Sequence, residues 1–157
     1  MARPVFVLNG PNLNMLGTRE PATYGNTSLA GIEALCHETA KGLGLSVDFR
    51  QTNHEGVLVD WLQEAGQASS GVIVNPGAYG HTSIAMHDAI RAVAPLRVVE
   101  VHLSNIHARE PFRHTTKIAP VAAGVICGFG PLGYAMALHA FASPSEGAGK
   151  QQGQATI

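Results

Sequence analysis

The sequence predicts an α/β protein with an open, five-stranded parallel sheet and helices on both faces of that sheet. Short apolar runs typical of strands alternate with segments of helical periodicity along the chain, and this alternation is typical of βαβ units. The run at residues 71–75, GVIVN, shows no polar alternation, as expected for a strand that is covered on both faces. Such folds bind ligands beyond the carboxyl ends of their strands, so functional residues are expected there.

The first half of the chain predicts two strands and two helices. The apolar run at 5–8 predicts the first strand. Ser28 is a suitable N-cap, and apolar residues at helical spacing after it predict a helix that ends at the glycines around Leu43. Alternating apolar residues predict a second strand at 46–51. The polar residues 52–54 are then expected to cap a second helix with one apolar stripe.

The second half of the chain continues this alternation. Thr82 and Ser83 predict the start of a third helix that runs through Ala92. The other expected elements are strands at 71–75, 96–103 and 124–127 and a last helix at 133–141. Together they predict a flavodoxin-like sheet in a single domain at residues 1–142. The tail at 143–157 is rich in Gly, Ser and Gln without periodicity, and it is expected to be disordered.

Composition limits the classes of partner. Charged residues make up only 13% of the 157 residues, against about a quarter in most proteins, which favours a homo-oligomer that buries surface between its copies. The formal net charge of −1 argues against nucleic-acid and membrane partners. With no membrane-spanning apolar run and no signal peptide, the protein is expected to be cytoplasmic. Cys36 and Cys127 lie in apolar patterns and are expected to be buried thiols.

The segment at 9–25 is the most unusual stretch of the chain. It is long for a connection in a small domain, and it spaces two Asn amides, one guanidinium and one phenol along a chain stiffened by two prolines. We interpret it as a catalytic lid that carries its own acid–base group. The alternative is an ordinary surface loop. The four side chains are those of Asn12, Asn14, Arg19 and Tyr24.

A second unusual loop follows the strand at 71–75. Its glycines allow backbone N–H groups to approach a ligand, and it leads into a helix N-terminus suited to anions. A tight turn with an N-cap would explain the glycines and Thr82 or Ser83, but it would not explain Asn75 and His81.

The strand at 96–103 carries an ionisable pair. Residues two apart share one face of a strand, so Glu100, His102 and Ser104 lie on the same face. In a covered sheet these groups are costly to bury unless they satisfy each other. Glu100 is therefore expected to fix one tautomer of His102 and to raise its basicity. The alternative is an edge strand with a solvated polar face.

Three further patterns carry weaker functional signals. The polar loop at 105–113 supplies cations for an anion, or it is simply solvated. The segment at 128–133 matches G-x-G-x-x-G, but no acidic residue follows about 20 positions on, so it predicts a tight strand-to-helix turn rather than a dinucleotide site. None of the eight histidines lies in a metal-binding motif, so no metal is expected.

Five segments taken together resemble the type II 3-dehydroquinate dehydratases of the shikimate and quinate pathways. They match that family in order and spacing and cover nearly the whole chain apart from the tail. Any one of these segments would be modest evidence for the family, whereas five of them in register are highly specific evidence. The segments are LNGPNLNMLGTREPATYG, QTNHEG, NPGAYGHTS, VEVHLSNIHAREPFRH and GVICGFGPLGYAMAL.

The resemblance implies a cofactor-free lyase that removes water from 3-dehydroquinate through an enolate, in a flavodoxin-like dodecamer. By motif position, Tyr24 resembles the base that takes the C2 proton, and Arg19 the cation that favours its phenolate. His102, oriented by Glu100, resembles the acid that protonates the leaving hydroxyl. The resemblance further implies that Asn12 holds the water that stabilises the enolate oxygen, and that Asp88 reaches the site of a neighbouring subunit. The substrate carboxylate would be bound by Asn75, Leu103 and Ser104, and the ring hydroxyls by His81 and Arg113.

The chain departs from the family pattern at two positions. Gly80 stands where a Thr is common and could loosen its loop, and His87 stands where an Arg is more usual. Two other functions stay open. One is a non-catalytic sensor of small carboxylates, which would not require Tyr24 with Arg19. The other is a carrier of FMN or a nucleotide, which the lack of a phosphate loop disfavours.

Overall fold

A five-stranded parallel sheet forms the centre of the fold, as predicted. The computed structural model describes residues 2–18 and 27–142, and within them the strand order is β2-β1-β3-β4-β5. The predicted tail at 143–157 lies outside these residues. The strands are β1 (Val5–Asn9), β2 (Val47–Gln51), β3 (Gly71–Asn75), β4 (Val98–His102) and β5 (Gly124–Cys127).

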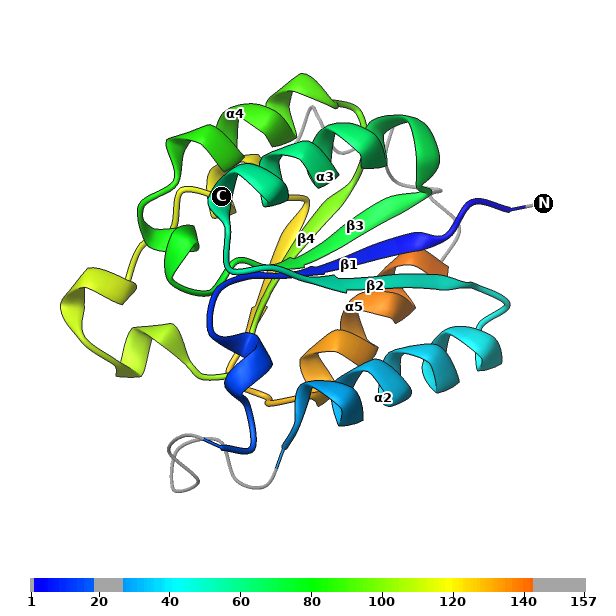
Figure 1. Cartoon of the computed structure of the whole chain (residues 1–157), viewed down its shortest axis with the longest axis horizontal. Coiled ribbons are helices and arrows are strands. Elements are labelled where there is room, and N and C mark those ends of the chain that lie inside the picture. Colours follow the sequence, from blue (N-terminus) through cyan, green and yellow to red (C-terminus); the bar gives the residue numbers. More distant parts are fainter. Residues whose placement is uncertain (1, 19–26, 143–157) are drawn as a thin grey trace, which may run out of the picture.

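Helices cover both faces of the sheet (Figure 1). Alternate strand residues point to opposite faces, so Val5 and Val7 pack in the core under α2 and α5, whereas Phe6 and Leu8 pack in the core under α3 and α4. In the described part of the chain the α-helices are α2 (Leu29–Gly42), α3 (Glu55–Ala68), α4 (Ile84–Ala92) and α5 (Leu132–Ala142). The connections in this part contain the short 3₁₀ helices η1 (Leu13–Met15), η2 (Gly77–His81), η3 (Ile106–Ala108), η4 (Pro111–Arg113) and η5 (Ala119–Val121).

Three helices start at the predicted caps, and two of these caps carry a side-chain bond. The Ser28 hydroxyl accepts a hydrogen bond from the Gly31 N–H, and the Ser83 hydroxyl accepts one from the Met86 N–H. The N-cap of α3 is His54, within the expected residues 52–54, but its side chain makes no cap bond. The Thr52 hydroxyl instead accepts from the His54 N–H one residue before the helix.

Two connections show how local bonds set the element bounds. The predicted strand at 96–103 is shorter as β4, because Leu96 is still in a turn and donates its N–H to the Val93 carbonyl. The glycine segment at 128–133 is the predicted tight turn. Gly128 and Gly130 have φ values of 97° and 60°, which only glycine adopts readily, and α5 begins two residues later.

Both cysteines are free thiols, as predicted. Cys36 lies on α2 in the core, where burial raises its pKa to about 12. Cys127 at the end of β5 is only half-buried, so its expected burial was wrong in degree.

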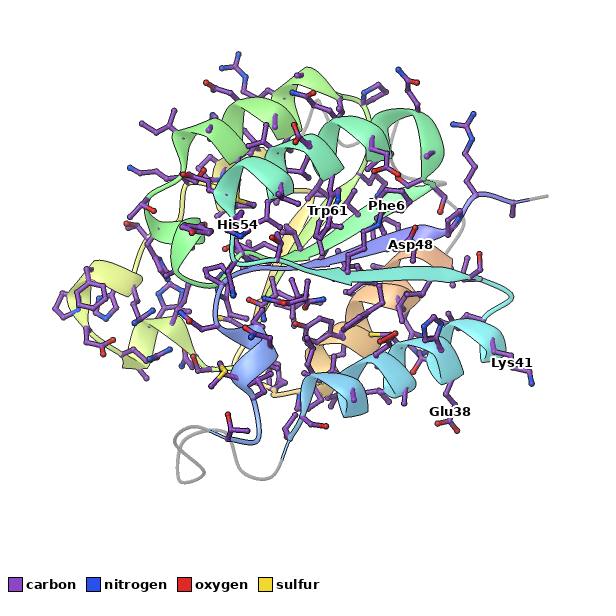
Figure 2. The ribbon with its side chains drawn as sticks, viewed as in Figure 1. Phe6, Glu38, Lys41, Asp48, His54 and Trp61 are labelled. Carbon is purple, nitrogen blue, oxygen red and sulfur yellow. The ribbon has the colours of Figure 1, made fainter. Side chains whose placement is uncertain are left out.

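The outer strand β2 is held to α3 by one arginine. Arg50 donates to the carboxylates of Asp48 and Glu64 at 2.7 to 2.9 Å. Its guanidinium lies 4.4 Å from the centroid of the Phe6 ring and 5.5 Å from that of Trp61. Glu38 lies on the outer side of α2, away from the sheet (Figure 2). No helix in the described part of the chain is long and apolar enough to cross a membrane.

Gly10 brings the ends of β1 and β3 into direct backbone contact. Its N–H donates to the Asn75 carbonyl at 2.8 Å, and a Cβ at this position would lie 2.4 Å from the carbonyl oxygen of Pro76. We expect Gly10→Ala to lower the free energy of unfolding by about 1–3 kcal/mol, because the two strand ends must separate. Urea denaturation measures this difference.

Gly56 is the matched control for that change. A Cβ at Gly56, in the first turn of α3, would meet nothing within 4 Å. Gly56→Ala should therefore be neutral or stabilising by up to about 1 kcal/mol. Equal stability of Gly10→Ala and Gly56→Ala would contradict the role assigned to the Gly10 contact.

Candidate active site

The site lies where the chain leaves the carboxyl ends of three adjacent strands, β1, β3 and β4. Between β1 and β3 the strand order reverses, which is where open α/β sheets form their ligand crevice. A cavity of about 280 Å³ opens there. Seven residues expected in the site line this cavity: Asn12, Asn75, His81, His102, Leu103, Ser104 and Arg113.

Glu100 and His102 form a buried carboxylate–imidazole pair on β4. The Glu100 Oε2 atom lies 2.5 Å from the His102 Nε2 atom, and the side chains are 0% and 6% exposed. The Thr116 hydroxyl donates to the other oxygen, Oε1, at 2.9 Å. Both carboxylate oxygens are therefore satisfied. Because β4 lies between β3 and β5, the alternative of an edge strand was wrong.

These contacts fix the chemistry available to His102. A carboxylate only accepts, so Nε2 carries a proton and Nδ1 is the nitrogen left for a ligand. Among the described residues nothing hydrogen-bonds Nδ1, and His102 lines the cavity. When protonated, the ring can give the Nδ1 proton to a leaving group while Glu100 stabilises the imidazolium.

His81 stacks beside this pair. Its ring centroid lies 5.8 Å from that of His102, with 26° between the ring planes. The His81 Nδ1 atom lies 2.9 Å from the Thr115 carbonyl oxygen. Since a carbonyl only accepts, Nδ1 carries the proton, and Nε2 of the neutral ring is an acceptor for a ligand hydroxyl.

Asn12 projects from the start of the loop after β1. Its backbone is left-handed, with φ of 68°, a region that Asn tolerates better than most residues. Its N–H donates to the Asn53 Oδ1 atom at 3.0 Å. The Asn12 side-chain amide makes no hydrogen bond to another described residue and is exposed at the cavity.

Two arginines give the cavity a cationic rim. Arg113 on η4 donates from Nε to the Glu110 carboxylate at 2.7 Å, and Arg109 donates from Nη1 to the Ser104 hydroxyl at 3.3 Å. The pKa of Glu110 is held below its usual range by its own backbone N–H and by Arg113. Among the described residues that line the cavity, two guanidinium groups stand with one carboxylate, an arrangement that suits an anionic ligand.

The structure does not place four of the expected site residues on the cavity wall, and one of them, Glu100, lies behind His102. Arg19 and Tyr24 lie outside the described residues. Asp88 is exposed on α4 and does not line the cavity, and its implied role belongs to another subunit. Within residues 2–18 and 27–142, no group of three His, Cys, Asp or Glu side chains could hold a metal ion.

Sequence reasoning missed three contributors to the site. Arg109 was recognised only as part of the polar loop, although its spacing to Arg113 could have marked it. Thr116 has no motif of its own and becomes visible only through its bond to Glu100. Tyr134 lies on α5, far from the loops in sequence, and accepts a hydrogen bond from the Asn75 amide at 2.9 Å.

Both departures from the family pattern lie beside Lys117. Gly80 is buried in η2, where a Cβ would meet the Pro76 Cγ atom at 2.7 Å, and its carbonyl accepts from the Lys117 N–H at 2.7 Å. The effect of this glycine on the mobility of the loop stays a prediction. The His87 Nδ1 atom lies 2.7 Å from the carbonyl oxygen of the same lysine.

An open parallel sheet with a buried carboxylate–imidazole pair at a cationic crevice defines an α/β protein built for acid–base chemistry on an anion. The sequence profile described as "Dehydroquinase class II" matches residues 3–142. The chain belongs to the class II dehydroquinase family.

Individual relatives are similar over nearly their whole length. The 3-dehydroquinate dehydratase of Chelativorans sp. (strain BNC1) is 68% identical over 91% of this chain and 99% of its own. That of Mesorhizobium japonicum is 65% identical over 90% of this chain and 98% of its own. The crystal structure of type II dehydroquinase from Butyrivibrio crossotus matches with a TM-score of 0.87 at 41% identity, over 90% of this chain and 99% of that one.

Proposed function

We propose that this protein is a 3-dehydroquinate dehydratase of the shikimate pathway, which removes water from 3-dehydroquinate to give 3-dehydroshikimate. The family and the names of the relatives support this activity. The observation that carries it in the structure is the Glu100–His102 pair, because a buried imidazole held by a carboxylate and open to a cavity is suited to donate a proton. A small-carboxylate sensor would not need this pair.

The proposed reaction divides the two proton transfers between two residues. Tyr24 takes the proton from C2, and the electron pair moves into the adjacent carbonyl to form an enolate. A phenol has a pKa near 10, so the phenolate requires a cation, the role proposed for Arg19. Asn12 would hold the water that stabilises the enolate oxygen. The enolate then returns to the carbonyl as the C1–C2 double bond forms and the C1–O bond breaks, and His102 protonates the departing hydroxyl, which leaves as water.

The proposed substrate contacts use the rest of the cavity wall. Asn75, Leu103 and Ser104 would bind the carboxylate, and His81 and Arg113 the ring hydroxyls. Asp88 would complete the site of a neighbouring subunit in a homododecamer, the assembly that the resemblance implies. The low charge content of the chain favours a homo-oligomer. A monomeric mass in solution would refute that assembly. The cytoplasmic location stays a prediction from the sequence.

The activity is tested by mixing chelator-treated protein with 3-dehydroquinate and following the ultraviolet absorbance of the conjugated product. A rise in absorbance is expected. No rise, with substrate binding still seen by calorimetry, would favour the sensor over the enzyme.

Arg113→Ala is expected to raise KM for 3-dehydroquinate by about 10- to 100-fold with a smaller change in kcat. A hydrogen bond to a charged group contributes about 1.5–3 kcal/mol, and each 1.4 kcal/mol is about tenfold. Arg91→Ala, an exposed position on α4 outside the cavity, is the matched control. A loss in kcat at unchanged KM would contradict a binding role for Arg113.

A further inference from the structure

A chain of four hydrogen bonds runs through the interior of the protein to the cavity wall. The Asn9 Nδ2 group donates to the Arg50 carbonyl at 2.9 Å, and the Tyr134 hydroxyl donates to Asn9 Oδ1 at 2.7 Å. Asn75 Nδ2 donates to the Tyr134 oxygen at 2.9 Å, and the Gly77 N–H donates to Asn75 Oδ1 at 3.2 Å. This path of hydrogen bonds thus joins β2, β1, α5 and β3.

The side chains of this path are removed from solvent. Asn9 and Tyr134 are 0% exposed, and Asn75 is 3% exposed. A buried polar group that loses its partner is costly, so each bond constrains the next. Burial also raises the pKa of Tyr134 above its ordinary range, which keeps its hydroxyl proton in place at any working pH.

The direction of every bond follows from the two ends of the path. A backbone carbonyl only accepts, so the Asn9 atom facing Arg50 must be Nδ2, and its other atom must be the acceptor Oδ1. The Tyr134 hydroxyl therefore donates its one hydrogen to Asn9, and it can only accept a hydrogen bond from Asn75. At the other end, the Gly77 N–H only donates, so it independently requires Oδ1 of Asn75 on its side.

Asn75 consequently has its amide orientation set from both ends. One Nδ2 hydrogen is bound by Tyr134, and the second remains available on a residue that lines the cavity. We propose that Asn9 and Tyr134 are positioning residues that hold the Asn75 amide so that it offers this N–H donor to the carboxylate of the substrate. This inference rests on the proposed function, which assigns that carboxylate to Asn75.

Tyr134→Phe removes one hydroxyl from the path and leaves the aromatic ring in the core. We expect it to raise KM for 3-dehydroquinate by about tenfold, the order of one hydrogen bond to a charged group, with kcat less affected. In an Asn75→Ala background the same change should leave KM as it is, because Tyr134 acts through Asn75. An unchanged KM in the native background, or an equal rise in both backgrounds, would overturn the proposal.

Leu138→Ala is the matched control. Leu138 is fully buried on the same helix and in the same core, and it has no part in the path. Leu138→Ala should destabilise the fold by more than Tyr134→Phe and leave KM unchanged at temperatures where both are folded. A rise in KM for Leu138→Ala equal to that for Tyr134→Phe would show a general effect of stability and overturn the positioning role.

A second measurement needs no turnover. In the substrate-free protein, the side-chain NH₂ of Asn75 is expected to exchange with solvent faster in Tyr134→Phe than in the native protein, as followed by ¹⁵N NMR. Asn9→Ala should have the same effect if Tyr134→Phe does not fold. If the exchange rate of the Asn75 amide is unchanged, the positioning role is overturned, even where the protein turns over 3-dehydroquinate. If exchange is faster but the native protein shows no turnover, the positioning role holds and the proposed function is wrong.

Discussion

His102→Gln is expected to lower kcat by about 10²- to 10⁴-fold, the contribution of a positioned acid or base, with little loss of stability. The Gln Nε2 group can occupy the place of the imidazole Nε2 and donate to Glu100, so the carboxylate keeps a partner. It has no ionisable group, so it cannot protonate the hydroxyl that leaves. Steady-state kinetics and urea denaturation together separate these two effects.

His102→Ala is the informative comparison for that variant. It leaves a fully buried carboxylate with only the Thr116 hydroxyl, and removing one partner of a buried pair lowers stability by about 3–5 kcal/mol. We therefore expect both variants to lose activity and only His102→Ala to lose most of its stability. If His102→Gln kept kcat within a few-fold of the native value, His102 could not be the acid.

Tyr24→Phe is expected to lower kcat by a similar factor of about 10² to 10⁴ and to leave substrate affinity nearly unchanged. The phenolate is the proposed base, and phenylalanine cannot accept the C2 proton. The ring keeps its size, so the remaining binding contacts are kept. Turnover followed by absorbance and substrate affinity measured by calorimetry give the two quantities separately.

Tyr79→Phe controls for the loss of a phenolic hydroxyl as such. Tyr79 donates to the Asn53 carbonyl at 2.7 Å and does not line the cavity. Its variant should retain kcat within a few-fold. Near-native turnover in Tyr24→Phe, or an equal loss in Tyr79→Phe, would remove Tyr24 from its proposed role.

The Glu100–His102 pair was predictable because two simple rules meet there. The two-residue period of a strand puts both side chains on one face, and the apolar strands around them indicate that this face is covered. Buried ionisable groups must then pair. Ser28 and Ser83 were predictable for a similar reason, since a cap bond spans only a few residues of the chain.

Thr116 and Tyr134 could not be found in that way. Their partners, Glu100 and Asn75, are 16 and 59 residues away in sequence, so the contacts exist only after the strands and α5 have packed. No local pattern distinguishes Tyr134 from any aromatic residue that fills a core. The bounds of β4 failed for a lesser reason, because an apolar Leu96 fits a turn as well as a strand.

In a library of variants made to change the substrate range, residue 10 is expected to tolerate substitution poorly. Every other amino acid adds a Cβ that approaches the Pro76 carbonyl oxygen, so each substitution there carries the cost in stability expected for Gly10→Ala, whatever the new substrate. Met15 and Ala78 line the cavity and are exposed positions on the two loops that Gly10 and Pro76 begin. Substrate specificity can therefore be changed at Met15 and Ala78, a few residues beyond the sheet, while the contact between Gly10 and Pro76 is kept.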